Sequence, residues 1–110
     1  MTEQSATLEP IYSALGGDED LAEIVEMFVD EMPTRISALL GYLDNSDWEA
    51  LRVTAHQLKG AAGSYGFTPI SPCAATLEDS IREEASEERI QEAVEDLVAM
   101  CRRARAGTPS

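Results

Sequence analysis

Apolar residues recur three or four positions apart along most of the chain, which predicts a series of amphipathic helices. Sustained apolar-polar alternation and Asn-Gly or Asp-Gly hairpin turns are missing, so the sequence gives little signal for strands. Short connections between amphipathic helices favour antiparallel neighbours. We therefore expect an all-α fold, an antiparallel up-down four-helix bundle with an additional short N-terminal helix across it.

Glycine, proline and acidic residues set the expected boundaries in the first half of the chain. A short helix is expected over residues 8–15, closed by the glycine pair that follows it. A second helix should begin at Asp18 or Asp20 and reach Met32. Proline suits the first position of a helix and not its interior, so Pro33 predicts either a new helix or a sharp kink at this point. The helical segment that follows Pro33 should end near residue 45.

The next helix has the best-marked start in the chain. Residues 46–49, Ser-Asp-Trp-Glu, have the form of a capping box, in which Ser46 accepts from the first-turn amides and Glu49 reaches back. This helix should run over residues 47–65, with Gly66 in the left-handed conformation that closes it.

Two further helices complete the expected bundle. The first could start at Thr68-Pro69 or at Ser71-Pro72, either of which would give a capped N-terminus with proline early. A polar link over residues 84–87 precedes the second. Cys73 and Cys101 should then lie at a similar height in the core as two reduced thiols. The expected organisation is an N-terminal segment over residues 1–17, the bundle over residues 18–107 and a tail over residues 108–110.

Composition narrows the class of protein. A chain of 110 residues, 44% apolar and 26% charged, is typical of one globular domain. The net charge of -13 argues against nucleic-acid binding, which requires clustered Lys and Arg. Neither a membrane-spanning stretch nor a signal peptide is evident, so we expect a cytoplasmic monomer. The initiating methionine and the small polar tail favour a freestanding protein.

Candidate chemistry centres on the only histidine and the only lysine, His56 and Lys59. No Asp or Glu occurs over residues 50–77, although 21 carboxylates occupy the rest of the chain. On a helix, Arg52, Lys59, Gly60 and Gly63 lie on the side of His56, which should point outward. No carboxylate lies near Lys59 in the sequence to compete with an incoming anion for its charge. The pattern therefore indicates a site that receives an anion.

The sequence favours a carrier over an enzyme with its own substrate pocket. A lone histidine on a helix is most often a surface residue or a satisfied core residue. Here, however, two glycines lie on its side of the helix, where each is about 1 kcal/mol less favourable than alanine. The sequence has no recognisable catalytic triad, no phosphate-binding Gly-rich loop and no second histidine for a metal site. An exposed imidazole with a neighbouring cation suits phosphoryl transfer instead.

The run His56-Gln57-Leu58-Lys59-Gly60-Ala61-Ala62-Gly63, followed by Gly66-Phe67 and Leu77-Glu78, resembles the signature of histidine phosphotransfer (HPt) domains. The resemblance extends over roughly residues 21–105. It implies a four-helix bundle whose surface histidine shuttles phosphate between receiver-domain aspartates.

For individual residues, the resemblance implies that His56 is the phosphoacceptor, usually on the nitrogen farther from the backbone. Lys59 would stabilise the phosphate, and Arg82 matches a position that is often basic, with Glu78 nearby. Gly60 and Gly63 would keep the docking surface low, and we also place Arg52 and Gln57 on that surface.

The implied partners are response-regulator receiver domains, a hybrid histidine kinase, or both. The chain would need no cofactor or metal of its own, because the receiver supplies Mg²⁺. Two alternatives stay open. One is a helical adaptor that binds a signalling partner and is never phosphorylated. The other is the phosphoacceptor segment of a histidine kinase, which predicts an ATP-binding domain that this sequence lacks.

Overall fold

The computed structural model describes residues 9–107 of the chain. Its elements in chain order are β1 (Ile11–Tyr12), α2 (Glu19–Asp30), α3 (Met32–Asp44), α4 (Trp48–Ser64), α5 (Ile70–Arg82), α6 (Glu87–Cys101) and β2 (Ala104–Arg105).

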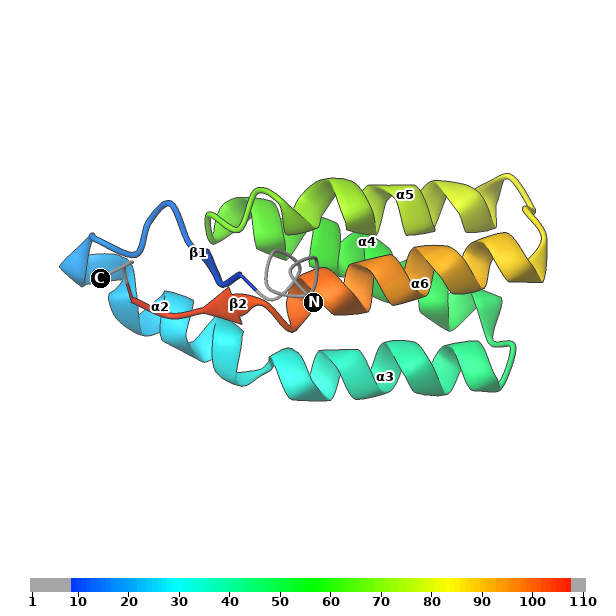
Figure 1. The fold of residues 1–110 in the computed structure, drawn as a ribbon, viewed down its shortest axis with the longest axis horizontal. Helices are drawn as coiled ribbons and strands as arrows, with labels where there is room; N and C mark the ends of the chain where they lie inside the picture. The colour runs from blue at the N-terminus through cyan, green and yellow to red at the C-terminus, as the bar shows by residue number, and fades with distance from the viewer. Residues whose placement is uncertain (1–8, 108–110) are drawn as a thin grey trace.

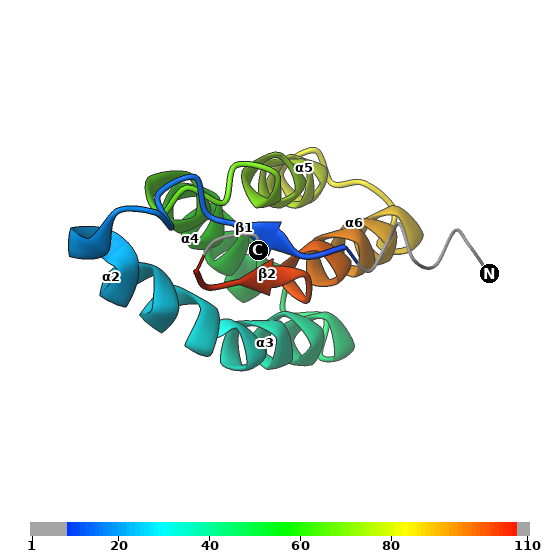
Figure 2. The same ribbon diagram turned by 60° about the vertical axis from the view of Figure 1, so that its left-hand side comes forward.

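Helices α3, α4, α5 and α6 lie side by side along the long axis and alternate in direction (Figure 1). Helix α2 leads into α3 at a bend and extends beyond one end of these four helices, as both views show (Figure 2). The predicted all-α, up-down bundle is therefore confirmed. The bend falls at Glu31, and Pro33 occupies the first turn of α3, where its missing N–H is not needed.

The core of the bundle is aliphatic, and each of its helices contributes fully buried side chains. Leu39, Leu51, Leu58, Leu77 and Leu97 are all shielded from solvent. At the end nearest α2 the core becomes aromatic. Phe28 of α2 packs with Tyr65 and Phe67, with ring centroids 5.2 Å apart in each pair, and so attaches α2 to the C-terminal end of α4.

The short N-terminal helix is not observed in the described part of its expected range, and Leu8 lies outside the described residues. Residues 11 and 12 form β1, which pairs in parallel with β2, Ile11 opposite Ala104. The Ile11 amide donates to the Arg103 carbonyl at 2.7 Å, and the Ala14 amide donates to the Gly66 carbonyl at 2.9 Å. The prediction was wrong because distant segments supply backbone partners that a local helix would otherwise have provided.

The predicted capping box is also absent. Ser46 has a φ of 54° and lies at the turn that closes α3, where the Asp47 amide donates to the Tyr42 carbonyl at 2.9 Å. Because Ser46 serves this turn, Asp47 caps α4 instead and accepts from the Ala50 amide at 3.2 Å. Glu49 turns away from the cap and pairs with Arg52.

The later boundaries agree more closely with expectation. Helix α4 ends at Ser64, and Gly66 has a φ of +83°, as predicted. Helix α5 begins at Ile70, directly after Pro69, so its start lies nearer to Thr68-Pro69 than to Ser71-Pro72, and no side chain caps it. Pro72 lies in the first turn of α5, where a backbone N–H has no helical partner, so it does not delay the helix.

Cys73 and Cys101 are free thiols, the first partly exposed and the second buried. Burial raises the pKa of Cys101 to about 12, with a smaller effect from Cys73, so its thiol is protonated and unreactive near neutral pH. Within residues 9–107, no helix combines the length and apolar character needed to cross a membrane.

Candidate functional site

His56 lies on α4 with its imidazole directed away from the bundle core, as predicted. Its side chain is 59% exposed, whereas Ala55 and Leu58 on the same helix are fully buried. The apolar face of α4 packs against α3 and α5 and therefore fixes the histidine on the outer surface.

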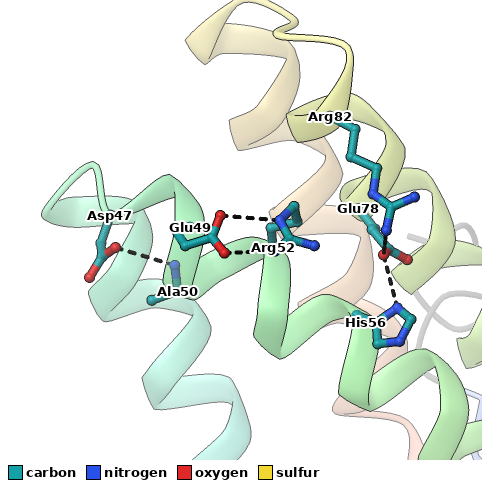
Figure 3. Close-up of polar contacts among 7 residues, drawn as sticks. All are labelled: Asp47, Glu49, Ala50, Arg52, His56, Glu78 and Arg82. Carbon is teal, nitrogen blue, oxygen red and sulfur yellow. Dashed lines mark hydrogen bonds and ion pairs between the residues drawn. The ribbon is translucent and has the colours of Figure 1, made fainter.

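A buried carboxylate lies directly beneath the imidazole. Glu78 of α5 has only 1% of its side chain exposed, and its Oε2 is 2.9 Å from His56 Nδ1 and 3.0 Å from Arg82 Nη2 (Figure 3). Its other oxygen, Oε1, is 2.9 Å from Lys59 Nζ, an ion pair without the angles of a hydrogen bond. Glu78 thus connects the histidine to two cations.

Helix α5 places Glu78 by packing closely on α4. Leu77 and Ala74 on α5 are fully buried, and Ser71 Oγ donates to the Lys59 carbonyl at 3.0 Å. This hydrogen bond fixes the start of α5 against the helix that carries His56. One turn after Glu78, Arg82 meets it in an i,i+4 pair.

The surroundings of Glu78 keep it ionised. Its interaction with Lys59 is the largest cause that lowers the pKa of this carboxyl, and the His56 hydrogen bond and the charges of Lys59 and Arg82 add to it. Burial acts in the opposite direction and is outweighed. Near neutral pH, the group beneath His56 is therefore a carboxylate.

The ionised carboxylate determines which imidazole nitrogen carries the proton. A carboxylate can only accept hydrogen bonds, so Nδ1 of His56 must be the donor in this 2.9 Å contact. In the neutral ring, the lone pair then lies on Nε2. The structure therefore presents a nucleophilic nitrogen on the exposed side of the ring, away from Glu78.

The expectation that no carboxylate competes for Lys59 was wrong. The acid-free stretch ends at residue 77, and the tertiary fold brings the next residue, Glu78, against Lys59. Two signals in the sequence pointed to it: Glu78 adjoins Leu77 on the apolar stripe of α5, and it precedes Arg82 by four residues. A charged residue on a buried stripe requires a partner.

The other predicted surface residues, Arg52 and Gln57, lie beside the histidine and form no hydrogen bond or ion pair with it among the described residues. Arg52 lies one turn earlier on α4 and is engaged by Glu49, with Nη2 to Oε2 at 2.6 Å and Nε to Oε1 at 3.2 Å. This pairing raises the pKa of Arg52 and lowers that of Glu49. Gln57 is exposed beside His56.

The glycines near His56 are not required by packing within the described residues. A Cβ at Gly60 would meet nothing within 4 Å, and one at Gly63 would meet only Ser71 Oγ at 3.9 Å. Alanine would fit at both positions and would favour the helix. Because the two glycines have no side chain, no side-chain atoms protrude from these positions next to the imidazole.

A second exposed feature lies on α2. Ile24 and Met27 are 41% and 57% exposed and border a hollow of about 250 Å³ that reaches Phe28 and Tyr65. Arg35 lies over the Phe28 ring, 5.3 Å from its centroid, at the edge of the same hollow. An apolar hollow on an otherwise acidic helix is a candidate contact surface.

Comparison with known proteins shows the family of this chain. A family model described as the Hpt domain matches residues 23–107. The chain belongs to the Hpt domain family. It is also 37% identical over 84 residues to the phosphotransferase RcsD of Escherichia coli (strain K12), a match that covers 73% of this chain and 9% of RcsD. No solved structure matches the chain.

Proposed function

We propose that this Hpt domain is a phosphoryl carrier in a phosphorelay and that Nε2 of His56 is the atom that holds the phosphoryl group. The contact between His56 Nδ1 and the ionised Glu78 carries this proposal, because it directs the lone pair to the exposed nitrogen. The membership of the Hpt family and the likeness to a phosphotransferase support the same role.

In the proposed step, the Nε2 lone pair attacks the phosphorus of an aspartyl phosphate on a receiver domain. The N–P bond forms while the bond between phosphorus and the aspartate oxygen breaks, and the aspartate leaves as a carboxylate. The proton stays on Nδ1, where Glu78 offsets the positive charge that develops on the ring. The reverse sequence of bond changes returns the group to a receiver.

Lys59 and Arg82 would stabilise the phosphoryl group electrostatically. Their side chains are 37% and 56% exposed, so each can move between Glu78 and a phosphoryl oxygen on His56. Phosphoryl transfer depends mainly on positioning and charge neutralisation. The receiver would bring its own Mg²⁺, and this chain would act as carrier without a nucleotide site.

The receiver, alone or as part of a hybrid histidine kinase, would dock over the histidine face of α4. Gly60 and Gly63 allow close approach of a partner to His56, and the apolar hollow beside Ile24 and Met27 offers further contact area. Arg52 and Gln57 would lie near the edge of this contact. The matched segment covers only 9% of RcsD, so we infer no particular relay partner of this chain from RcsD.

Transfer from a labelled, phosphorylated receiver domain with Mg²⁺ tests the proposal. We expect wild-type protein to gain acid-labile, base-stable label and His56→Gln to gain none. Lys59→Ala should gain label more slowly and lose it sooner. If wild type binds the receiver without gaining label, the protein is an adaptor and the carrier proposal fails. If His56→Gln is labelled as strongly as wild type, His56 is not the phosphoacceptor and the proposal fails as well.

A further inference from the structure

An apolar groove of about 450 Å³ lies where the α2–α3 bend meets the end of α6. It is separate from the histidine site, since none of its lining residues contributes to that site. Its apolar walls are formed by Val29, Met32, Pro33, Ile36, Cys101 and Ala104. The volume falls within the range of roughly 300–1,000 Å³ that is typical of small-molecule pockets.

Two arginines, Arg102 and Arg105, complete the lining of this groove. Together with Arg103, they make up three of the eight Lys and Arg residues of a chain whose net charge is -13. Arg103 is directed elsewhere, because its Nε donates to the Glu9 carbonyl at 2.7 Å and its Nη1 contacts Met100 Sδ. Arg102 and Arg105 are therefore the cations at the groove.

Arg105 is held in place by the backbone. Its Nη1 donates to the Arg102 carbonyl at 2.9 Å and to the Ala104 carbonyl at 2.8 Å. Among residues 9–107, no carboxylate lies within ion-pair distance of Arg102 or Arg105. The remaining N–H groups of a positioned guanidinium suit a carboxylate, which can accept two parallel hydrogen bonds.

We propose that this groove binds an aliphatic carboxylate, with the hydrocarbon tail along the apolar walls and the carboxylate between Arg102 and Arg105. Charge complementarity selects this class of ligand. Outside the histidine site, the acidic surface repels anions, whereas the groove combines apolar walls with two cations. A neutral or cationic amphiphile with the same tail length makes the apolar contact with the groove walls but forms no ion pair with the two arginines.

The arginines also face the C-terminal end of α6, where positive charge offsets the helix dipole. A purely structural role of this kind predicts that substituting them lowers stability and leaves ligand affinity unchanged. The two roles are therefore separable by measuring both quantities on the same variants.

Binding is measured by calorimetry and by ¹⁵N–¹H amide titration of the full chain with sodium octanoate. 1-Octanol and octyltrimethylammonium serve as matched ligands. We expect octanoate to bind saturably, to shift amides of residues 29–36 and 101–105, and to bind about tenfold or more tightly than either control. Scattered, unsaturable shifts, or equal binding of the three amphiphiles, would overturn the proposal.

Octanoate binding to variants of the protein provides the second part of the test. Arg102→Gln with Arg105→Gln should weaken octanoate binding by about tenfold or more, whereas Arg89→Gln, at the opposite end of α6, should leave it unchanged. Val29→Trp, which fills the groove and keeps both arginines, should abolish binding. Undiminished affinity in the double variant or in Val29→Trp refutes the assignment, and circular dichroism confirms that each variant is folded.

Discussion

The substitution Glu78→Gln tests how the buried carboxylate controls His56. It keeps the size of the side chain and removes its charge. Lys59 and Arg82 can only donate hydrogen bonds, so both compete for the single carbonyl of the new amide. The NH₂ group then turns toward Nδ1 of His56, which favours the tautomer with its proton on Nε2. That tautomer has no lone pair at the exposed nitrogen.

The expected magnitudes follow from the contacts. A hydrogen bond to a charged group contributes about 1.5–3 kcal/mol, so we expect single-turnover phosphorylation of His56 to slow by about 10- to 100-fold. The two ion pairs are partly exposed and contribute about 0.5 kcal/mol each. With the weakened histidine bond, we expect the free energy of unfolding to fall by about 2 kcal/mol and the melting temperature by about 10 °C.

Three measurements examine this prediction: transfer from a phosphorylated receiver under single-turnover conditions, the imidazole tautomer from ¹⁵N NMR, and thermal unfolding. Asp79→Asn is the matched control, since Asp79 is the exposed neighbour on α5 and undergoes the same chemical change. A variant that keeps the Nδ1-protonated tautomer and transfers within twofold of wild type would refute the reasoning. A loss of rate equal to that of Asp79→Asn would refute it as well.

Three further predictions concern glycine, backbone strain and acid. Gly60→Ala should raise the free energy of unfolding by about 0.5–1 kcal/mol and slow receiver transfer, because the new methyl group meets no atom of the described chain and protrudes beside His56. Gly41→Ala, equally open on α3, should raise stability alone, and equal transfer rates for the two variants would contradict the docking role of Gly60. Glu84→Gly should stabilise the protein by about 1 kcal/mol, since Glu84 has a φ of 57° where it closes α5; unchanged denaturant midpoints would show that the conformation is not strained. The stability that Glu78 contributes should be complete above pH 4.5, its ordinary pKa, and should be lost as the pH falls through its lowered pKa in the folded protein. A stability difference between wild type and Glu78→Gln that persists undiminished into strong acid would count against this.

The helices and the orientation of His56 could be read from the sequence because both depend on local spacing. The apolar positions of α4 repeat with the helical period, so the side of the helix that carries His56 and Gly60 had to face outward. The left-handed conformation of Gly66 was also predictable from the local sequence, because helices commonly end in this conformation and glycine adopts it readily.

The residue that caps a helix was harder to predict, because a candidate cap can also be needed in the turn that ends the preceding helix. The sequence of residues 46–49 fits a capping box, yet Ser46 is needed in the turn that ends α3, and Asp47 replaces it as the cap of α4. The structure of the N-terminal segment was also hard to predict, because its backbone partners lie far away in the sequence. The partners of Ile11 lie near residue 104, and no local pattern encodes that pairing.

The sequence by itself determined the helical class, the outward position of His56 and the cation one turn away, because each follows from the period of a single helix. Only the tertiary structure decided that Glu78 lies beneath the imidazole, since this contact joins residues 22 positions apart on different helices. It depends on how α5 is rotated and shifted against α4, which the packing of both apolar faces determines. The choice of nucleophilic nitrogen on His56 therefore follows from helix packing.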